Sequence, residues 1–421
     1  MIIRILFVLC MFTSLSWGNW PQFRGPNNDG LAPGHPSLPL EFHETKNVKW
    51  KTAIHDEGWS TPVIWDKQIW LTTATEDGHK MYVLCLDRDS GEIQFDKQLL
   101  DIKNPRPLGN DVNTYASCSS VIEEGRVYVH FGSYGTACID TNTFETLWLR
   151  TDLPCNHFRG PASSPILFED TVILTFDGAD YQYQCALKKT TGDTVWKTDR
   201  NSTFLDLDDK GQPKRDGDFR KAYSTPIFIE VDGNPRMIVS ASYNVFCYDP
   251  RTGKEIWRID TKCYSNASMA LFGHGLIYAI TGRGNPELLA IQPGGKGNIT
   301  DSSLIQWRFD KGIPSMPSPV LVGDLIYFVN NGGILSCVEA KTGKLVWKTR
   351  LSGQYYASPI VADGKLFFTS TAGDVTIIQL GRSYNALKTN KFGSGFMASP
   401  AVSGNALYLR SKTHLYRIEK E

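Results

Sequence analysis

The chain has 421 residues, of which 41% are hydrophobic and 12% aromatic, and it contains 37 glycines and 22 prolines. This composition supplies a hydrophobic core that is interrupted by many turns, and it excludes a disordered chain. Lysine plus arginine and aspartate plus glutamate each number 44, so the chain has no basic excess. Nucleic acid and anionic membranes therefore lack their usual electrostatic signature as partners.

The chain begins with the pattern of a cleavable signal peptide over residues 1–18. The apolar run 5–15 is followed by residues 16–18, which place small side chains three and one positions before a cut at Asn19. The run is shorter than the ~20 residues of a membrane-spanning helix, which is the alternative interpretation. Cys10 lies inside the run, so no lipobox is present. The sequence predicts a periplasmic or secreted protein without a transmembrane span after signal cleavage.

After an N-terminal extension over residues 19–46, a repeat fills the remainder of the chain. A strand-starting Ser/Thr-Pro dipeptide recurs, and each copy is followed by an apolar strand, a turn and another apolar strand. Six clear copies are Thr61-Pro62, Ser164-Pro165, Thr225-Pro226, Ser318-Pro319, Ser358-Pro359 and Ser399-Pro400. Two degenerate copies, Ser119-Ser120 and Ser268-Met269, lie in the large gaps and bring the number of units to eight.

Each unit predicts four short strands that are joined by tight turns. In the sixth unit the strands begin at Ser318, Leu325, Ile334 and Leu345, and glycine-containing turns separate them. A large ring recurs in the fourth strand of most units, as Phe95, Trp148, Trp196, Trp257, Trp307 and Trp347. Because a four-stranded sheet cannot bury its faces alone, these rings favour packing between neighbouring sheets around an axis.

The two ends of the repeat region complete each other. The eighth unit stops one strand short, whereas residues 47–52 have the fourth-strand pattern, including Trp50, but precede the first unit. This strand can close the ring and hide a sheet edge that would otherwise be open. The sequence therefore predicts an all-β fold, an eight-bladed β-propeller of four-stranded antiparallel blades over residues 47–421, in which residues 47–52 complete the last blade.

The cysteines are predicted to be mostly unpaired. Five of them fall at one equivalent position in the third strand of five blades, namely Cys85, Cys138, Cys185, Cys247 and Cys337. A small buried thiol suits such a packed position, and equivalent positions of separate blades lie too far apart for a disulfide. One disulfide is possible among Cys118, Cys155 and Cys263, and the sequence does not indicate which two of them would form it.

The repeat resembles the pyrroloquinoline-quinone-like (PQQ-like) propeller repeat, with its Ser-Pro start, Thr-Gly-Lys turn and outer-strand tryptophan. Three further segments, 20–27, 220–226 and 292–298, are similar to those of bacterial exported propellers that are described as BamB-like. This resemblance implies the fold. It does not settle function, because such propellers include dehydrogenases, assembly scaffolds and binding modules.

Two functions follow from this resemblance. The first is a monomeric, non-enzymatic scaffold for a protein, peptide or glycan partner, with no cofactor and no metal. The alternative is a PQQ-dependent alcohol or sugar oxidoreductase, which would use the quinone and Ca²⁺. Against it, no two cysteines are adjacent, no Cys-x-x-Cys-His is present, and no set of calcium ligands can be assigned. A hydrolase also stays open, because a Ser-His-Asp arrangement cannot be read without geometry.

A candidate binding site is predicted at one mouth of the propeller. Connections between blades, and between second and third strands, emerge on one face, and most of the long insertions lie there. Just before the inner strands, these connections place aromatic and polar residues, namely Glu57, Trp59, Asn113, Tyr115, His157, Arg159, Arg220, Tyr223, Tyr264, Asn266, Tyr355, Tyr356 and Phe396. Rigid strands and variable loops suit a ligand or peptide site. The alternative is that these side chains only plug the central channel.

Overall fold

The computed structural model describes residues 18–109 and 112–421. The predicted signal peptide, residues 1–18, thus lies outside the described residues except for Gly18, and so does Cys10. Within the described ranges, no helix is long and apolar enough to span a bilayer.

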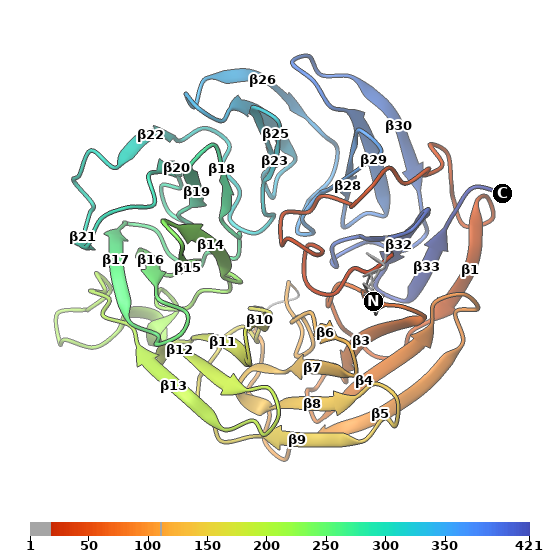
Figure 1. Ribbon diagram of the computed structural model, residues 1–421, viewed down its shortest axis with the longest axis horizontal. Helices are drawn as coiled ribbons and strands as arrows, with labels where there is room; N and C mark the ends of the chain where they lie inside the picture. Colours follow the sequence, from red (N-terminus) through yellow and green to blue (C-terminus); the bar gives the residue numbers. More distant parts are fainter. Residues whose placement is uncertain (1–17, 110–111) are drawn as a thin grey trace, which may run out of the picture.

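Eight antiparallel sheets surround a central axis, as the sequence predicts (Figure 1). Blades 1 to 4 contain β2 (Val63–Trp65), β3 (Gln68–Ala74), β4 (Lys80–Asp87), β5 (Ile93–Asp101); β6 (Val121–Glu123), β7 (Arg126–His130), β8 (Thr136–Asp140), β9 (Thr146–Arg150); β10 (Ile166–Phe168), β11 (Thr171–Asp177), β12 (Gln182–Lys188), β13 (Thr194–Asp199); and β14 (Ile227–Val231), β15 (Asn234–Ser240), β16 (Asn244–Tyr248), β17 (Glu255–Asp260).

Blades 5 to 8 repeat the pattern with β18 (Leu271–Gly273), β19 (Leu276–Ile280), β20 (Leu288–Ile291), β22 (Ile305–Phe309); β23 (Val320–Val322), β24 (Leu325–Val329), β25 (Ile334–Glu339), β26 (Leu345–Arg350); β27 (Ile360–Ala362), β28 (Lys365–Thr369), β29 (Asp374–Gln379), β30 (Ala386–Lys391); and β31 (Ala401–Ser403), β32 (Ala406–Arg410), β33 (His414–Ile418), β1 (Val48–Ala53). A short fifth strand, β21 (Gly297–Asn298), pairs parallel to β17 at the edge of blade 4. Two 3₁₀ helices lie in connections, η1 (Gly132–Tyr134) and η2 (Lys214–Gly217).

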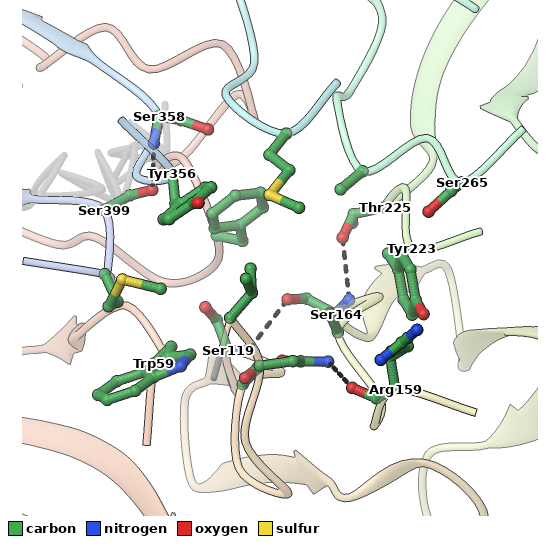
Figure 2. A pocket seen from close by; sticks show the side chains of 18 of the residues that line it. Trp59, Ser119, Arg159, Ser164, Tyr223, Thr225, Ser265, Tyr356, Ser358 and Ser399 are labelled. Carbon is green, nitrogen blue, oxygen red and sulfur yellow. Dashed lines mark hydrogen bonds between the residues drawn. The ribbon is translucent and has the colours of Figure 1, made fainter. Parts of the chain in front are cut away.

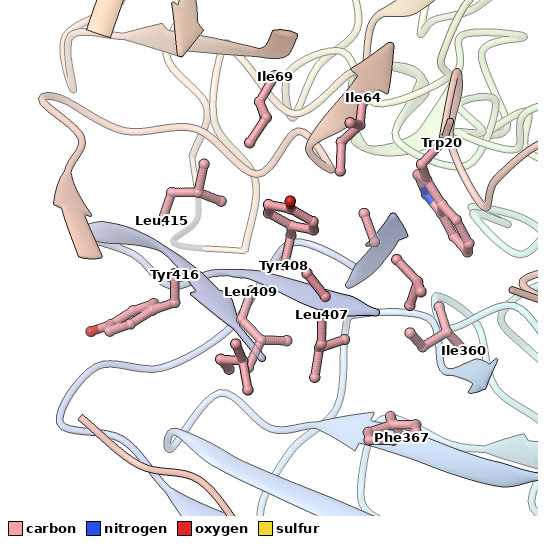
Figure 3. Close-up of a cluster of buried hydrophobic side chains, with 14 of the residues drawn as sticks. Trp20, Ile64, Ile69, Ile360, Phe367, Leu407, Tyr408, Leu409, Leu415 and Tyr416 are labelled. Carbon is pink, nitrogen blue, oxygen red and sulfur yellow. The ribbon is translucent and has the colours of Figure 1, made fainter. Parts of the chain in front are cut away.

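The predicted ring closure is confirmed. Strand β1 pairs antiparallel with β33, with Trp50 opposite Arg417 and Thr52 opposite Leu415, and it completes blade 8. A hydrophobic cluster fills this junction and joins blades 7, 8 and 1 (Figure 3). Because β1 covers the free edge of β33, the ring has no open sheet edge at the join.

The outer-strand tryptophans attach six of the eight blades to the next one. The indole Nε1 of six of them donates a hydrogen bond to a backbone carbonyl in the turn of the following blade. These bonds are Trp50 to Arg88 (3.1 Å), Trp148 to Lys189 (2.9 Å), Trp196 to Pro250 (3.1 Å), Trp257 to Pro293 (3.1 Å), Trp307 to Ala340 (3.0 Å) and Trp347 to Gly381 (3.0 Å). The tryptophan that recurs in the outer strand therefore holds neighbouring blades together, and its indole N–H finds a hydrogen-bond partner, as expected for this side chain.

The junction of blades 1 and 2 departs from this pattern in two compensating ways. Phe95 replaces the tryptophan, and Phe144 occupies the position in the next turn where other blades have glycine. Their rings stack with centroids 4.9 Å apart and an interplanar angle of 9°. Stacking thus replaces the indole hydrogen bond, and Phe144 adopts a positive φ of 60° to make it.

The packed turns predict an unequal cost for glycine substitution. Gly253 has a φ of +69°, and a Cβ there would overlap the ring of Trp196, whereas Gly275 has a φ of +71° and nothing within 4 Å. Gly275→Ala should cost roughly 1–2 kcal/mol, from backbone strain alone. Gly253→Ala should cost about 1–3 kcal/mol more, because it also overpacks the blade junction. Urea denaturation measures both, and equal losses of unfolding free energy would contradict the role of the junction.

The Ser/Thr residue of the repeat links the inner strands. In one blade the hydroxyl of this residue accepts a hydrogen bond, and the donor is the backbone N–H of the residue at the equivalent position in the preceding blade. Six such bonds occur, Thr61 to Ser119 (2.9 Å), Ser119 to Ser164 (3.0 Å), Ser164 to Thr225 (2.9 Å), Met269 to Ser318 (3.0 Å), Ser318 to Ser358 (2.9 Å) and Ser358 to Ser399 (2.9 Å). The sequence predicts Ser268 at this position of blade 5, and this register is wrong by one residue, because Met269 occupies it, two residues before β18. Met269 has no hydroxyl to accept the bond, and at this junction Ser224 Oγ donates to the Ser268 carbonyl at 2.9 Å.

The N-terminal extension crosses the inner strands. The Pro21 carbonyl accepts from Ile122 N–H at 2.8 Å in blade 2, and Leu31 pairs with Val361 in blade 7. Arg24 is fully buried and donates to the carbonyl of Pro319 at 2.6 Å in blade 6. Burial lowers the pKa of Arg24 to about 10, and the nearby Asp29 partly opposes this shift. The extension therefore joins blades that are far apart in the sequence.

One register prediction for the cysteines is wrong. Cys85, Cys138, Cys247 and Cys337 each lie opposite the large ring of the outer strand, but in blade 3 that position belongs to Ala186, opposite Trp196. Cys185 lies one residue earlier, and because strands alternate faces it points to the other side of the blade. All eight described cysteines are buried and free, including Cys118, Cys155 and Cys263.

Candidate functional site

A pocket of about 200 Å³ lies at the mouth of the propeller where the inner strands begin (Figure 2). All eight blades contribute a lining residue from the segment just before their inner strand. These residues are Trp59, Ser117, Arg159, Tyr223, Ser265, Met316, Tyr356 and Met397. Phe23 of the N-terminal extension and Arg283, between β19 and β20, also line the pocket. The rigid ring therefore fixes a site that is assembled from every unit.

Five hydroxyls in the pocket belong to the series of hydrogen bonds that links the inner strands of neighbouring blades. Ser119, Ser164, Thr225, Ser358 and Ser399 line the pocket, and each accepts a backbone N–H of the preceding blade. None of the described lining residues is a histidine. A serine nucleophile needs an adjacent base, so these hydroxyls do not form the Ser-His arrangement of a hydrolase.

Three cations give the pocket a positive character. Arg159, Lys221 and Arg283 line it, and no described lining residue carries a carboxylate. Lys221 is 5% exposed, and its ammonium forms an ion pair with Asp218 and donates to the Asp218 carbonyl at 3.0 Å. Burial lowers the pKa of Lys221; Asp218 opposes this shift, and the charges of Arg159 and Arg283 add to it. The three positive charges therefore lie close enough to influence one another.

Aromatic side chains supply the apolar part of the pocket. Trp59, Tyr223 and Tyr356 are half-buried and line the pocket from different blades (Figure 2). Burial raises the pKa of Tyr223 well above its usual value, and its hydroxyl lies 3.5 Å from the His157 carbonyl. The buried Nε1 of Trp59 has no hydrogen-bond acceptor among the described residues.

The structure brings five of the thirteen predicted mouth residues into the pocket, namely Trp59, Asn113, Arg159, Tyr223 and Tyr356. Asn113 supports the loop geometry, because its side-chain amide donates to the Arg159 carbonyl at 2.8 Å. The sequence position just before an inner strand thus locates the pocket, and side-chain direction then selects which residues reach it.

The other eight predicted residues lie outside the lining and hold the surrounding connections. Four of them form side-chain hydrogen bonds: Tyr115 donates to the Arg106 carbonyl at 2.7 Å, His157 Nε2 accepts from Ser133 N–H at 3.0 Å, Asn266 donates to the Ser268 carbonyl at 2.9 Å, and Tyr355 donates to the Ser352 carbonyl at 2.9 Å. Two pack on aromatic rings, Tyr264 on Phe219 with ring centroids 4.7 Å apart and Phe396 on Phe392 with ring centroids 5.4 Å apart. Arg220 forms an ion pair with Asp206 at 2.9 Å, and Glu57 pairs through its backbone with Ala74.

Sequence reasoning missed three pocket residues that define its chemistry. Lys221 follows a predicted residue directly and points to the pocket, whereas Arg220 points to Asp206. Arg283 lies in the connection between the second and third strands of blade 5, which the sequence predicts on this face without distinguishing its individual residues. Phe23 belongs to the Trp-Pro-Gln-Phe-Arg-Gly segment, and only the folded path of the extension reveals its contact with the mouth.

Eight antiparallel blades with a pocket at one mouth define a β-propeller with a candidate binding site. The chain belongs to the family of outer membrane protein assembly factor BamB, whose family model matches residues 185–421. This agrees with the PQQ-like repeat that the sequence predicts. No match occurs among curated proteins.

Solved structures show the same fold. BamB from Moraxella catarrhalis is 12% identical, with a TM-score of 0.60 over 88% of this chain and 99% of that chain. A europium-containing methanol dehydrogenase is also 12% identical, with a TM-score of 0.64 over 95% of this chain and 98% of that chain. At this level of identity, both likenesses concern the fold alone.

Proposed function

We propose that this protein is an exported, non-enzymatic scaffold that binds a protein partner through the mouth pocket. The observation that carries the proposal is the lining itself, since every blade places at least one residue there and the set combines aromatic rings with three cations. Interfaces favour large aromatic and arginine side chains on a rigid support. The match to an outer membrane assembly factor supports a protein partner.

The proposal includes export and domain organisation. The leader pattern of residues 1–18 directs the chain to the periplasm or the medium, and residues 47–421 act as one monomeric propeller domain. Residues 19–46 contribute to this domain from outside the repeat, because Arg24 and Leu31 bind its inner strands.

The likeness in fold to a methanol dehydrogenase makes a quinone-dependent oxidoreductase the second candidate function. A Ca²⁺-quinone site needs oxygen ligands, above all carboxylates. The described lining residues include three cations and no carboxylate, and the described chain holds no group of three or more His, Cys, Asp or Glu side chains that could bind a metal. These residues do not fit the metal, and we derive no catalytic step from them.

The binding proposal predicts that three substitutions abolish partner capture. Trp59→Ala, Arg159→Ala and Tyr223→Ala together should remove the central contacts, because such anchors carry most of an interface's free energy. Pull-down from the native cell envelope measures capture. A control triple variant on the opposite face, Arg251→Ala, Lys254→Ala and Arg382→Ala, should capture normally. Survival of capture in the mouth variant, with its melting temperature unchanged, would refute the proposal.

Two further experiments distinguish a protein partner from a glycan partner and the scaffold from the oxidoreductase. Protease treatment of the envelope extract should remove the captured material, and capture that resists protease would instead indicate the glycan partner. Addition of the quinone and Ca²⁺ with alcohols or sugars should give neither saturable binding nor dye reduction. Turnover in that assay would establish the oxidoreductase and overturn the scaffold.

A further inference from the structure

We propose that the mouth pocket binds a carboxylate of the partner's polypeptide, held by Arg159, Lys221 and Arg283, with an apolar neighbour of that carboxylate packed on the aromatic residues. This inference deepens the proposed function and rests on it. It names the chemistry that the partner must present.

The charge distribution is the first argument. The chain as a whole is balanced, with 44 basic and 44 acidic residues, yet three cations converge on one pocket. Lys221 is paired with Asp218, whereas neither Arg159 nor Arg283 forms an ion pair within residues 18–109 and 112–421. Closely placed cations repel each other, so the folded site is stabilised when an anion enters it.

The donors available at the site are the second argument. The Arg159 guanidinium donates one hydrogen bond, to the carbonyl of Gly109, whereas a guanidinium carries five N–H donors. Arg283 is exposed. A guanidinium fork matches a carboxylate in bidentate geometry. The pocket thus offers donors in excess and needs an acceptor-rich, negatively charged group.

The size of the pocket restricts the ligand further. Its volume of about 200 Å³ is below the roughly 300–1,000 Å³ that is usual for small-molecule sites. It therefore suits one or two side chains of a larger partner rather than an enclosed cofactor. Met316 and Met397 also line the pocket, and methionine adapts to irregular apolar shapes. A partner segment with an acidic residue next to an apolar one would contact both the cations and the apolar side chains of the lining.

Two sources of the carboxylate can be separated with three short fluorescent peptides. The first is acetylated and amidated, with Phe-Glu at its centre; the second replaces Glu by Gln; the third is the Phe-Gln peptide with a free C-terminal carboxylate. Fluorescence polarisation against the full chain measures affinity. We expect saturable, salt-weakened binding of the first or the third peptide, which identifies a side-chain or a terminal carboxylate, and binding at least about tenfold weaker for the neutral peptide.

A double variant tests the residues. Arg159→Gln with Arg283→Gln should weaken binding of the acidic peptide about tenfold or more, since charge-assisted hydrogen bonds are lost. Arg251→Gln with Arg382→Gln removes the same charge on the opposite face and should leave the affinity unchanged. Equal binding of the neutral and acidic peptides, or no saturable binding of either anionic peptide at millimolar concentration, overturns the inference. Partner capture that still depends on Trp59 and Tyr223 would then show that the proposed function survives alone.

Discussion

A chain that lacks residues 19–53 is expected to lose cooperative unfolding and to aggregate. The deletion removes β1, whose pairing with β33 covers the edge of blade 8. It also removes Trp50 Nε1 and Thr52 Oγ1, which donate to the carbonyls of Arg88 at 3.1 Å and Gly91 at 2.7 Å in blade 1. An exposed edge strand is a template for pairing with another chain. Light scattering and thermal unfolding measure the outcome.

Adding the deleted segment back as a peptide tests whether the instability of the truncated chain comes from the missing strand that closes the propeller. A synthetic peptide of residues 19–53, added to the truncated chain, should restore the melting transition in a saturable manner, because strand addition to an open edge supplies the missing ladder. The same peptide with Trp50→Ala should restore it less, since it pairs with β33 but does not dock on blade 1. A truncated chain that melts like the full chain would contradict the role of β1 in closing the ring.

Most of the architecture was predictable because one local pattern repeats eight times. The Ser/Thr-Pro start, the turn glycine and the outer-strand ring each perform one physical task in successive blades, as Ser164, Gly253 and Trp196 illustrate. The different register of Cys185 can also be read from its distance to the turn glycine of its blade. Cys247 lies six residues before the turn glycine Gly253, whereas in blade 3 Ala186, not Cys185, has that spacing.

The site was only partly predictable, because side-chain direction is not a local property. Arg220 and Lys221 are adjacent, and the fold turns the first to Asp206 and the second to the pocket. Phe23 reaches the mouth only because the extension is bound across the inner strands by contacts such as Arg24 to Pro319. Contacts between segments that are about 300 residues apart depend on the completed ring, and no periodicity in the sequence encodes them.

Acid should destabilise the fold through two buried histidines. His130 and His157 pack against Phe176, with ring centroids 5.4 and 5.9 Å from it. Burial lowers the pKa of His157 to about 4; Asp180 opposes this shift and Arg106 adds to it. Burial, with a smaller contribution from His157, lowers the pKa of His130 to about 3. Both rings are therefore neutral in the native state at pH values where the unfolded chain already binds protons, below an ordinary pKa near 6.5.

The sign of the effect follows from proton linkage. Between pH 7 and 5 the unfolded chain takes up protons that the native chain does not, so unfolding becomes more favourable as the pH falls. Each histidine should contribute about 2 kcal/mol of lost stability over this interval. His157→Gln keeps an acceptor for Ser133 N–H, and His130→Gln keeps a polar partner for Thr136 Oγ1, which lies 2.7 Å from the histidine nitrogen. Urea denaturation at both pH values should show that the double variant loses about 4 kcal/mol less than the native chain. Groups common to both proteins cancel in this comparison, so an equally steep loss in the double variant would show that the two histidines are not the acid-sensitive groups.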